Sequence, residues 1–225
     1  MNRAPDSWPC PVPGGTEKEY ALSFDRGRRR RVLVVPALFD EANRLRRLTI
    51  ETMRRLDAAG IDTFLPDLPG CNESLFALER VTLADWSAAA AAAAGHFRAS
   101  HVWAVRGGAL ACGGLGLPVF AYAPVSGAAI LRQLLRMRVL ASREAGREES
   151  AAGLLEMALA DGIDLAGYRL CAAMVADLQG AQGADGTVIA QGDIGGAGLW
   201  LRAEPGEDAG QAEALAARIA AECGT

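Results

Sequence analysis

The segment Val102–Cys112, which reads VWAVRGGALAC, is the most informative stretch for predicting the fold. Its apolar beginning predicts a buried strand, His101–Arg106, and the glycines and small residues that follow predict a sharp turn into a helix. Many enzymes present a nucleophile at such a strand–turn–helix, usually written G-x-S-x-G, because residues of little bulk allow the tight turn. Here residues 104–108 read AVRGG, so Arg106 stands at the nucleophile position.

The groups that a Ser–His–Asp triad needs are missing around this turn. A guanidinium stays protonated at physiological pH, so Arg106 cannot attack as an oxygen or sulfur nucleophile. The chain has two histidines, His96 and His101. His101 begins the strand that Arg106 ends, about 15 Å away at about 3.3 Å per residue, and His96 ends the preceding helix at that same edge. No histidine follows residue 101, where the triad base would come after the last strand. We therefore predict no catalytic residue.

Strand-like and helix-like segments alternate on both sides of the turn. Short apolar runs predict buried strands at 31–36, 61–66 and 119–123, with two further strand candidates at 187–191 and 198–202. Apolar residues at helical spacing predict helices at 43–59, 83–97, 128–144 and 211–222. Strands separated by helices of this length form βαβ crossovers, so we predict an α/β fold with a mainly parallel sheet flanked by helices.

The remaining segments complete one predicted domain, 1–225. The N-terminal residues 1–15 are rich in Pro and Gly and predict an irregular segment without a signal peptide. Residues 146–182 contain a helix, the turn Asp161–Gly162, a short strand through Tyr168 and a second helix. We interpret residues 146–182 as a small cap insertion.

The composition narrows the class of function. A net charge of −4 favours neither nucleic acid nor an anionic membrane surface as a partner. No apolar run reaches the roughly 20 residues of a membrane-spanning helix. The five cysteines are scattered, without a C-x-x-C pair or a Cys/His cluster, so we expect no metal site, no cofactor and no disulfide framework. The expectation is a reduced, cytoplasmic protein.

Five stretches of the chain resemble one bacterial family. They are VPALFDEANRLRR (Val35–Arg47), LPDLPGCNES (Leu65–Ser74), WAVRGGAL (Trp103–Leu110), APVSGAAILRQLLRMR (Ala123–Arg138) and GYRL (Gly167–Leu170). Over about residues 32–170 the chain is similar to the exosortase A system-associated hydrolase, type 2, an α/β-hydrolase-like family encoded beside exopolysaccharide and PEP-CTERM protein-sorting genes. Its members also tend to carry Arg where a hydrolase has Ser. The resemblance implies an α/β-hydrolase-like fold and a role in that system, whereas the word hydrolase reflects the fold and not a chemistry.

Arg106 and Gly107 are the first candidates for a ligand pocket. Ligands of parallel α/β sheets bind beyond the carboxyl ends of the strands, where Arg106 lies, and a helix that starts at Gly107 offers N–H groups to an anion. Arg106 either binds an anion there or replaces the nucleophile structurally. Asp40 and Glu41 follow the first buried strand. We expect one of them to cap the next helix, and Glu41 to offer the salt bridge that a buried guanidinium needs.

Cys71 and Ser126 complete the pocket candidates. Cys71 lies in the turn after the strand 61–66 as a possible thiol nucleophile, although no histidine can activate it. Ser126 either binds a ligand or, more simply, caps the helix that follows it. Asp193 lies near the place of a triad acid and is interpreted as a solvated turn residue.

Two arginine-rich stretches lie outside these candidates. Arg132, Arg136 and Arg138 belong to the predicted helix 128–144, and Arg28–Arg31 precede the first buried strand. Both patterns are typical of solvated faces. The helix patch alternatively contacts an acidic partner or a polyanionic glycan intermediate, and Arg28–Arg31 are interpreted as a hairpin turn.

Three functional hypotheses remain open. The first is a non-catalytic binding or accessory protein of the exosortase or exopolysaccharide system, whose partner is a small anionic ligand or a protein of that system. The second is a hydrolase that acts on an acyl or glycan-linked ester by chemistry outside the triad; no general base of near-neutral pKa is visible near the turn. The third, a purely structural subunit, requires that no cavity lies above Arg106.

Overall fold

The computed structural model describes residues 5–202 and 204–224, and a seven-stranded sheet forms its centre. The strands are β1 (Pro5–Val12), β2 (Gly15–Phe24), β3 (Arg31–Val35), β4 (Asp62–Pro66), β5 (His101–Val105), β6 (Val119–Tyr122) and β9 (Thr187–Ile189). Their order across the sheet is β1-β2-β4-β3-β5-β6-β9. All pairs from β4 to β9 are parallel, and β2 is antiparallel to both of its neighbours. The predicted α/β fold with a mainly parallel sheet is confirmed.

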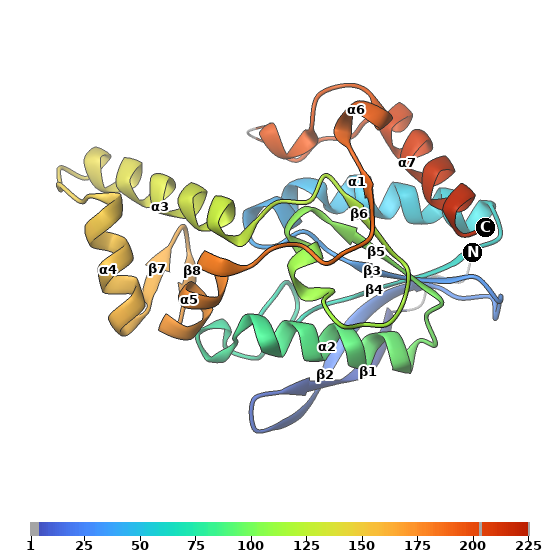
Figure 1. The fold of residues 1–225 in the computed structure, drawn as a ribbon, viewed down its shortest axis with the longest axis horizontal. Coiled ribbons are helices and arrows are strands. Elements are labelled where there is room, and N and C mark those ends of the chain that lie inside the picture. Colours follow the sequence, from blue (N-terminus) through green and yellow to red (C-terminus); the bar gives the residue numbers. More distant parts are fainter. Residues whose placement is uncertain (1–4, 203, 225) are drawn as a thin grey trace.

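Helices cover both faces of this sheet (Figure 1). α1 (Asp40–Ala58) and α7 (Ala209–Glu222) pack together on one face, and α2 (Leu83–His96) lies on the other. Successive side chains of β3 point to opposite faces of the sheet and pack into the apolar cluster on each face. Val32 and Val34 join the apolar cluster under α1 and α7, whereas Leu33 and Val35 join the cluster under α2. Burial on both faces explains why this strand reads as an unbroken apolar run.

Residues 127–180 form an arm beside the sheet (Figure 1). Its elements are α3 (Gly127–Glu144), α4 (Ala151–Asp161), the hairpin of β7 (Ile163–Leu165) and β8 (Tyr168–Leu170), and α5 (Ala172–Gly180). α3 extends away from the sheet, and the other elements of the arm pack along it before the chain returns to β9. The hairpin turn is made by Ala166 and Gly167, with φ angles of 50° and 86°, as a type I′ turn requires. The division of the chain into one domain with a cap insertion at 146–182 stays a prediction.

The prediction of an irregular segment at 1–15 is wrong where the structure describes it, and residues 1–4 lie outside the described residues. Residues 5–12 form β1, an edge strand that pairs antiparallel with β2. Trp8 and Cys10 are fully buried, and Trp8 packs against the rings of His96 and Phe97. Burial of alternate side chains therefore holds the segment as a strand. Its prolines are tolerated because an edge strand has one side without ladder partners.

Two further elements differ from the expected ones. Residues 199–201 form a short 3₁₀ helix, η3 (Leu199–Leu201), and not a strand. This segment is held over α1, where Arg44 Nη1 donates a hydrogen bond of 2.9 Å to the carbonyl oxygen of Trp200, and it does not pair with β9. The helix after β5 is also a 3₁₀ helix, η2 (Arg106–Ala111).

The stretch Arg28–Arg31 is not a hairpin turn, because β4 lies between β2 and β3 in the sheet. Arg29 and Arg30 are exposed, as expected of a solvated face. Arg28 and Arg31 instead form ion pairs of 3.0 and 3.2 Å with Asp62, whose side chain is fully buried. Ion pairs with the buried carboxylate of Asp62 therefore connect the segments at the amino edge of the sheet.

Candidate functional site

The turn after β5 lies where the chain reverses its direction across the sheet. From β3 the chain passes first to β4 on one side and then to β5 on the other. Open α/β sheets bind ligands at the carboxyl ends of strands that meet in this way. Arg106 directly follows β5 with a φ of 52°, so the predicted sharp turn is present. Glu41 lies in the first turn of α1, which follows β3, and therefore at the same edge.

Two glycines allow the backbone after Arg106 to pack closely. A Cβ at Gly107 would lie 2.7 Å from Cδ1 of Ile130, and a Cβ at Gly108 would collide with the carbonyl oxygens that end β3. Both glycines are buried. The N–H groups that we expected a helix start to offer an anion therefore belong to a short 3₁₀ turn enclosed by protein.

Each of the three nitrogens of the Arg106 guanidinium donates a hydrogen bond to the protein. Its Nε donates to Oε2 of Glu41 at 3.0 Å and its Nη2 to Oε1 at 2.8 Å, a bidentate pair. Its Nη1 donates to the carbonyl oxygen of Ala123 at 2.9 Å. The ring of Trp200 covers it, with the ring centre 4.0 Å from Cζ. The side chains of Arg106 and Glu41 are 12% and 8% exposed, so the expected salt bridge is confirmed and is nearly buried.

Asp40 does not cap α1, and neither does Glu41. The N-cap residue is Phe39, without a side-chain hydrogen bond, and its φ of 56° turns the backbone so that the helix begins at Asp40. Asp40 instead forms an ion pair of 2.6 Å with Arg44, one turn along α1. Both carboxylates still lie in the first turn, where the helix dipole favours negative charge.

Ser126 has the simpler of its two predicted roles. It is the N-cap of α3, and its Oγ accepts a hydrogen bond of 3.3 Å from the backbone N of Ala129. Asp193 is exposed, as expected, but lies in the short helix α6 (Gln191–Ile194) and not in a turn. Its carboxylate accepts a hydrogen bond of 2.9 Å from the backbone N of Ala190 and so stabilises the start of that helix.

Cys71 lines a small cavity that neither Arg106 nor Glu41 lines. The cavity has a volume of about 110 Å³ and lies between the loops that follow β3 and β4. Its lining is mostly apolar, with Asn43, Asn72, Cys71 and Tyr168 as the polar residues. Tyr168 reaches the cavity from β8 and packs edge-on against Phe39, with ring centres 5.3 Å apart. A ligand role for this cavity, and for the six candidate residues, stays a prediction.

The thiol of Cys71 is a poor nucleophile in this setting. Burial raises its pKa to about 12, and the nearby carboxylates of Asp67 and Glu19 act in the same direction. Burial also raises the pKa of both of these carboxyl groups. The thiolate, which is the reactive form, is therefore disfavoured at neutral pH.

Both histidines lie at the amino edge of the sheet, as predicted. His101 is the first residue of β5, and its Nδ1 lies 2.9 Å from Oγ of Ser100. Burial lowers the pKa of His101, which favours its neutral form. His96 ends α2 and packs against the rings of Trp8 and Phe97. Neither imidazole lies at the edge that carries Arg106.

Two groups that hold Arg106 were not predicted from the sequence. Trp200 falls in a segment that we expected to form a strand, and the carbonyl oxygen of Ala123 is a backbone group without a signature of its own. Tyr168 was placed in the cap insertion but not at a cavity. The resemblance stretch Gly167–Leu170, which contains Tyr168, is the one signal that could have marked it.

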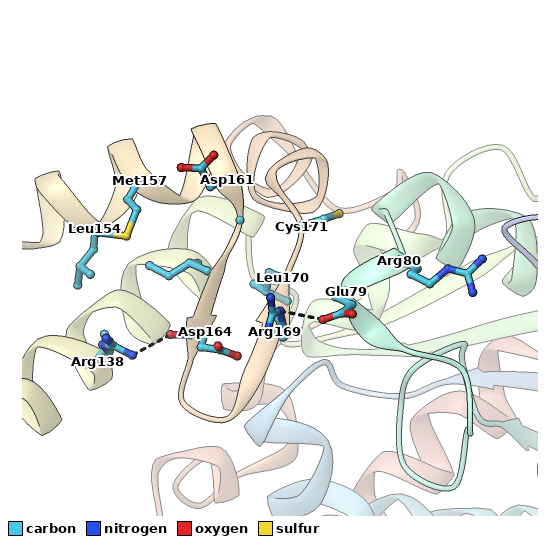
Figure 2. A pocket seen from close by; sticks show the side chains of 12 residues that line it. Glu79, Arg80, Arg138, Leu154, Met157, Asp161, Asp164, Arg169, Leu170 and Cys171 are labelled. Carbon is cyan, nitrogen blue, oxygen red and sulfur yellow. Dashed lines mark hydrogen bonds and ion pairs between the residues drawn. The ribbon is translucent and has the colours of Figure 1, made fainter.

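A larger hollow of about 480 Å³ lies in the arm, between α4, the β7–β8 hairpin and η1 (Leu78–Arg80) (Figure 2). Arg169 of the hairpin points toward Glu79 of η1 and forms an ion pair of 2.8 Å with it. Arg138 of α3 donates to Glu149 through two nitrogens, at 2.9 and 3.1 Å, and to the carbonyl oxygen of Asp164. These two arginines are therefore engaged in holding the hairpin to its neighbours.

The described residues hold neither a metal-binding cluster nor a helix that could span a membrane. No group of three or more His, Cys, Asp or Glu side chains there is arranged to hold a metal ion. None of the described helices is both long enough and apolar enough to cross a bilayer.

No protein-family model matches the chain, and a comparison with the curated proteins finds no match. Among solved structures, the chain is similar to a protein of Agrobacterium vitis S4 assigned as a hydrolase, with a TM-score of 0.48 and 16% identity. It is also similar to Est1E of Butyrivibrio proteoclasticus with bound ferulic acid (TM-score 0.48, 14% identity) and to a thermophilic esterase of Thermogutta terrifontis with bound malate (TM-score 0.43, 15% identity).

These matches cover 63%, 72% and 71% of this chain, in the same order. The chain in turn spans 61%, 67% and 59% of the three proteins, so it matches only part of each. At these identities and TM-scores the matches carry no conclusion about activity. The α/β-hydrolase-like fold of this chain rests on its parallel sheet, its flanking helices and the sharp turn at Arg106.

Proposed function

We propose that this chain is a non-catalytic α/β-hydrolase-fold protein that serves the exosortase A or exopolysaccharide system as a binding or accessory factor in the cytoplasm. The proposal that the protein is non-catalytic rests on the position and the contacts of Arg106. Its guanidinium stands at the nucleophile position and is bound by Glu41 and Ala123 under the ring of Trp200. The assignment to this system rests on the five sequence stretches that resemble the family.

A protein partner fits this geometry better than a small anionic ligand. An anion bound at the turn after β5 would need a free positive charge. The carboxylate of Glu41 already neutralises Arg106 through two hydrogen bonds. The carbonyl oxygen of Ala123 accepts from a third nitrogen of the guanidinium, and the Trp200 ring stacks on its face. We therefore favour, of the two expected partners, a protein of the same system.

The competing proposal is an ester hydrolase that works without a triad. Cys71, the thiol considered above, lines the small cavity, and its raised pKa speaks against this chemistry. Purified protein should therefore hydrolyse p-nitrophenyl acetate or butyrate no faster than buffer, and a serine-directed fluorophosphonate should not label it. The variant Arg106→Ser should be equally inert, because it supplies a hydroxyl without a base. Stoichiometric labelling, or turnover that Cys71→Ala removes, would favour the hydrolase.

The accessory role needs a test in the native host. Deletion of the gene should reduce exopolysaccharide export or the sorting of PEP-CTERM proteins. The double variant Arg106→Met/Glu41→Leu replaces the ion pair by apolar side chains of similar length, and should restore the phenotype if the pair is structural. A double variant that folds but does not restore it would show that Arg106 acts on a ligand, against our proposal.

A further inference from the structure

One face of α3 carries three arginines without acidic partners. Arg132, Arg136 and Arg143 are exposed, and at about 100° per residue they lie within about 40° of one another around the helix. We call these three residues the arginine stripe. Its length from Arg132 to Arg143 is about 16 Å at 1.5 Å per residue. Leu140, which is 52% exposed, lies beside the stripe, about 40° from Arg136.

The stripe points away from the protein. Of the buried residues of α3, Leu134 lies on the opposite side of the helix, at least about 160° from each stripe arginine, and Leu131 lies at least about 100° from each. Figure 1 shows α3 extending away from the sheet, with α4, α5 and the hairpin together at one side of it. The stripe is therefore a ridge that another molecule can reach without any rearrangement of the arm.

Most of the other arginines of α1, α3 and α7 form ion pairs, although Arg46 of α1, like the stripe, has none among the described residues. On α1, four arginines form ion pairs with carboxylates: Arg44, Arg47, Arg54 and Arg55. On α3 itself, Arg138 faces the arm and is paired with Glu149. Within residues 5–202 and 204–224, no ion pair joins a stripe arginine to a carboxylate. Glu144, the one acidic residue of α3, lies about 100° around the helix from Arg143.

We infer that the arginine stripe is a docking surface for an acidic helical segment of a partner protein. The guanidinium fork matches carboxylates, so the stripe is complementary to glutamates or aspartates. Spacings of four and seven residues, about 6 and 10.5 Å along the axis, are repeated by side chains on one face of a partner helix. Leu140 offers that helix an apolar contact beside the charges.

Charge favours a short partner segment over an extended polyanion. The whole chain carries −4, so the chain outside the stripe is more negative still. A membrane surface or a long anionic polysaccharide would contact more of the molecule than the stripe, and the net negative charge of the rest of the chain opposes its binding. An acidic segment of about three helical turns covers the stripe alone. This inference rests on the accessory role proposed above, but it concerns the exposed face of α3 and not the turn at Arg106.

The probe is a synthetic helical peptide with glutamates spaced four and seven residues apart and a leucine between them, measured by fluorescence anisotropy. We expect binding that weakens as salt is raised. The triple variant Arg132→Gln/Arg136→Gln/Arg143→Gln should bind at least about tenfold more weakly. The matched control Arg47→Gln/Arg54→Gln/Arg218→Gln removes the same charge at exposed, paired positions and should bind as the parent does. The double variant Arg106→Met/Glu41→Leu, which changes the turn without leaving a buried charge unpaired, should also bind unchanged, which separates this test from the test of Arg106.

Three results would overturn the inference. The first is equal binding of a peptide with the same composition but with its glutamates spread around the helix. The second is equal loss in the stripe variant and the matched control. The third is binding of alginate or of phosphatidylglycerol vesicles that requires the stripe, without binding of the peptide, which would assign the surface to another class of partner.

Discussion

The two edges of the parallel sheet hold a buried arginine in nearly the same way, although only the carboxyl edge is where such sheets bind ligands. At the amino edge, Arg31 donates through Nη1 and Nη2 to both oxygens of Asp25, at 3.0 and 2.9 Å. Its Nε donates to the carbonyl oxygen of Phe97 at 2.8 Å, and its Cζ lies 4.6 Å from the ring centre of Phe64. Asp62 adds a second carboxylate.

At the carboxyl edge, Arg106 repeats this construction. It has a bidentate carboxylate from Glu41, a carbonyl oxygen from Ala123 and the ring face of Trp200. Because the amino-edge arrangement joins strand ends and loops of the protein itself, its repetition favours a structural role for Arg106. The difference lies in the number of carboxylates. Arg31 has two, whereas Arg106 depends on Glu41 alone, and this difference can be tested.

The largest effect should follow from Glu41→Ala. This change leaves a nearly buried guanidinium without a counter-charge, and breaking such a pair costs about 3–5 kcal/mol of unfolding free energy. Urea unfolding of the parent and the variant measures it. The control is the double variant Arg106→Met/Glu41→Leu, which should recover most of the loss because it buries no charge. A single variant within about 1 kcal/mol of the parent would mean that Arg106 is neutralised by something other than Glu41.

Asp62→Asn at the amino edge should cost less, although the Asp62 side chain is fully buried. Arg31 keeps the bidentate carboxylate of Asp25, so the loss is that of charged hydrogen bonds, about 1–3 kcal/mol. The same urea experiment measures it. A larger loss of unfolding free energy for Asp62→Asn than for Glu41→Ala would contradict this interpretation. It would mean that Asp25 alone does not compensate Arg31 for the loss of Asp62.

The sequence predicted the parts of the fold whose cause is local. Buried parallel strands must be apolar on both faces, so β3 and its neighbours could be recognised as short apolar runs. The pair of Glu41 and Arg106 was predictable because both follow parallel strands, whose carboxyl ends share one edge, and because a buried guanidinium needs a carboxylate. β1 was missed since its prolines are typical of loops, whereas the burial of Trp8 depends on distant residues of α2.

The parts of the site that could not be predicted depend on long-range packing. Trp200 covers Arg106 because the segment after β9 folds back over α1, where Arg44 holds the Trp200 carbonyl oxygen. No local pattern in that segment distinguishes a 3₁₀ turn over a helix from a short edge strand. Tyr168 likewise reaches the cavity only because the arm places the β7–β8 hairpin beside Phe39.

The amino edge should also show a pH dependence that Asp25 causes. Hydrogen bonds from Arg31, and then from the backbone N of Gly27, lower the pKa of Asp25 to about 2. Because the folded pKa lies below the unfolded value, the stabilisation is present above about pH 4 and is lost as the pH falls toward about 2. The unfolding free energy of the parent should therefore exceed that of Asp25→Asn at neutral pH, and the difference should shrink between about pH 4 and 2. The carboxylate is 43% exposed, so we expect a smaller effect than at Asp62.

If the difference in unfolding free energy between the parent and Asp25→Asn stayed constant between about pH 4 and 2, Asp25 would not be the cause of the pH dependence. Comparing the two proteins is necessary because other carboxyl groups act in the opposite direction. Burial raises the pKa of Glu19 and Asp67, so protonation of these two groups stabilises the folded state as the pH falls. At acid pH the unfolding free energy of the parent therefore sums the effects of several carboxyl groups. The difference between the pH curves of the parent and of Asp25→Asn isolates the effect of Asp25.

The smallest effect should come from the ion pair of Arg169 with Glu79, which joins the hairpin to η1 (Figure 2). Like Glu41 with Arg106, it is an arginine with one carboxylate, but its side chains are 70% and 49% exposed. Water and salt screen such a pair, so a double-mutant cycle with Arg169→Gln and Glu79→Gln should give a coupling of about 0.2–1 kcal/mol that decreases at high salt. The hairpin should stay in place in both variants, because Tyr168 is also held by its ring contact with Phe39. A coupling as large as that of the buried pair, and insensitive to salt, would show that burial is not what separates the two, and the structural interpretation of Arg106 would lose its physical basis.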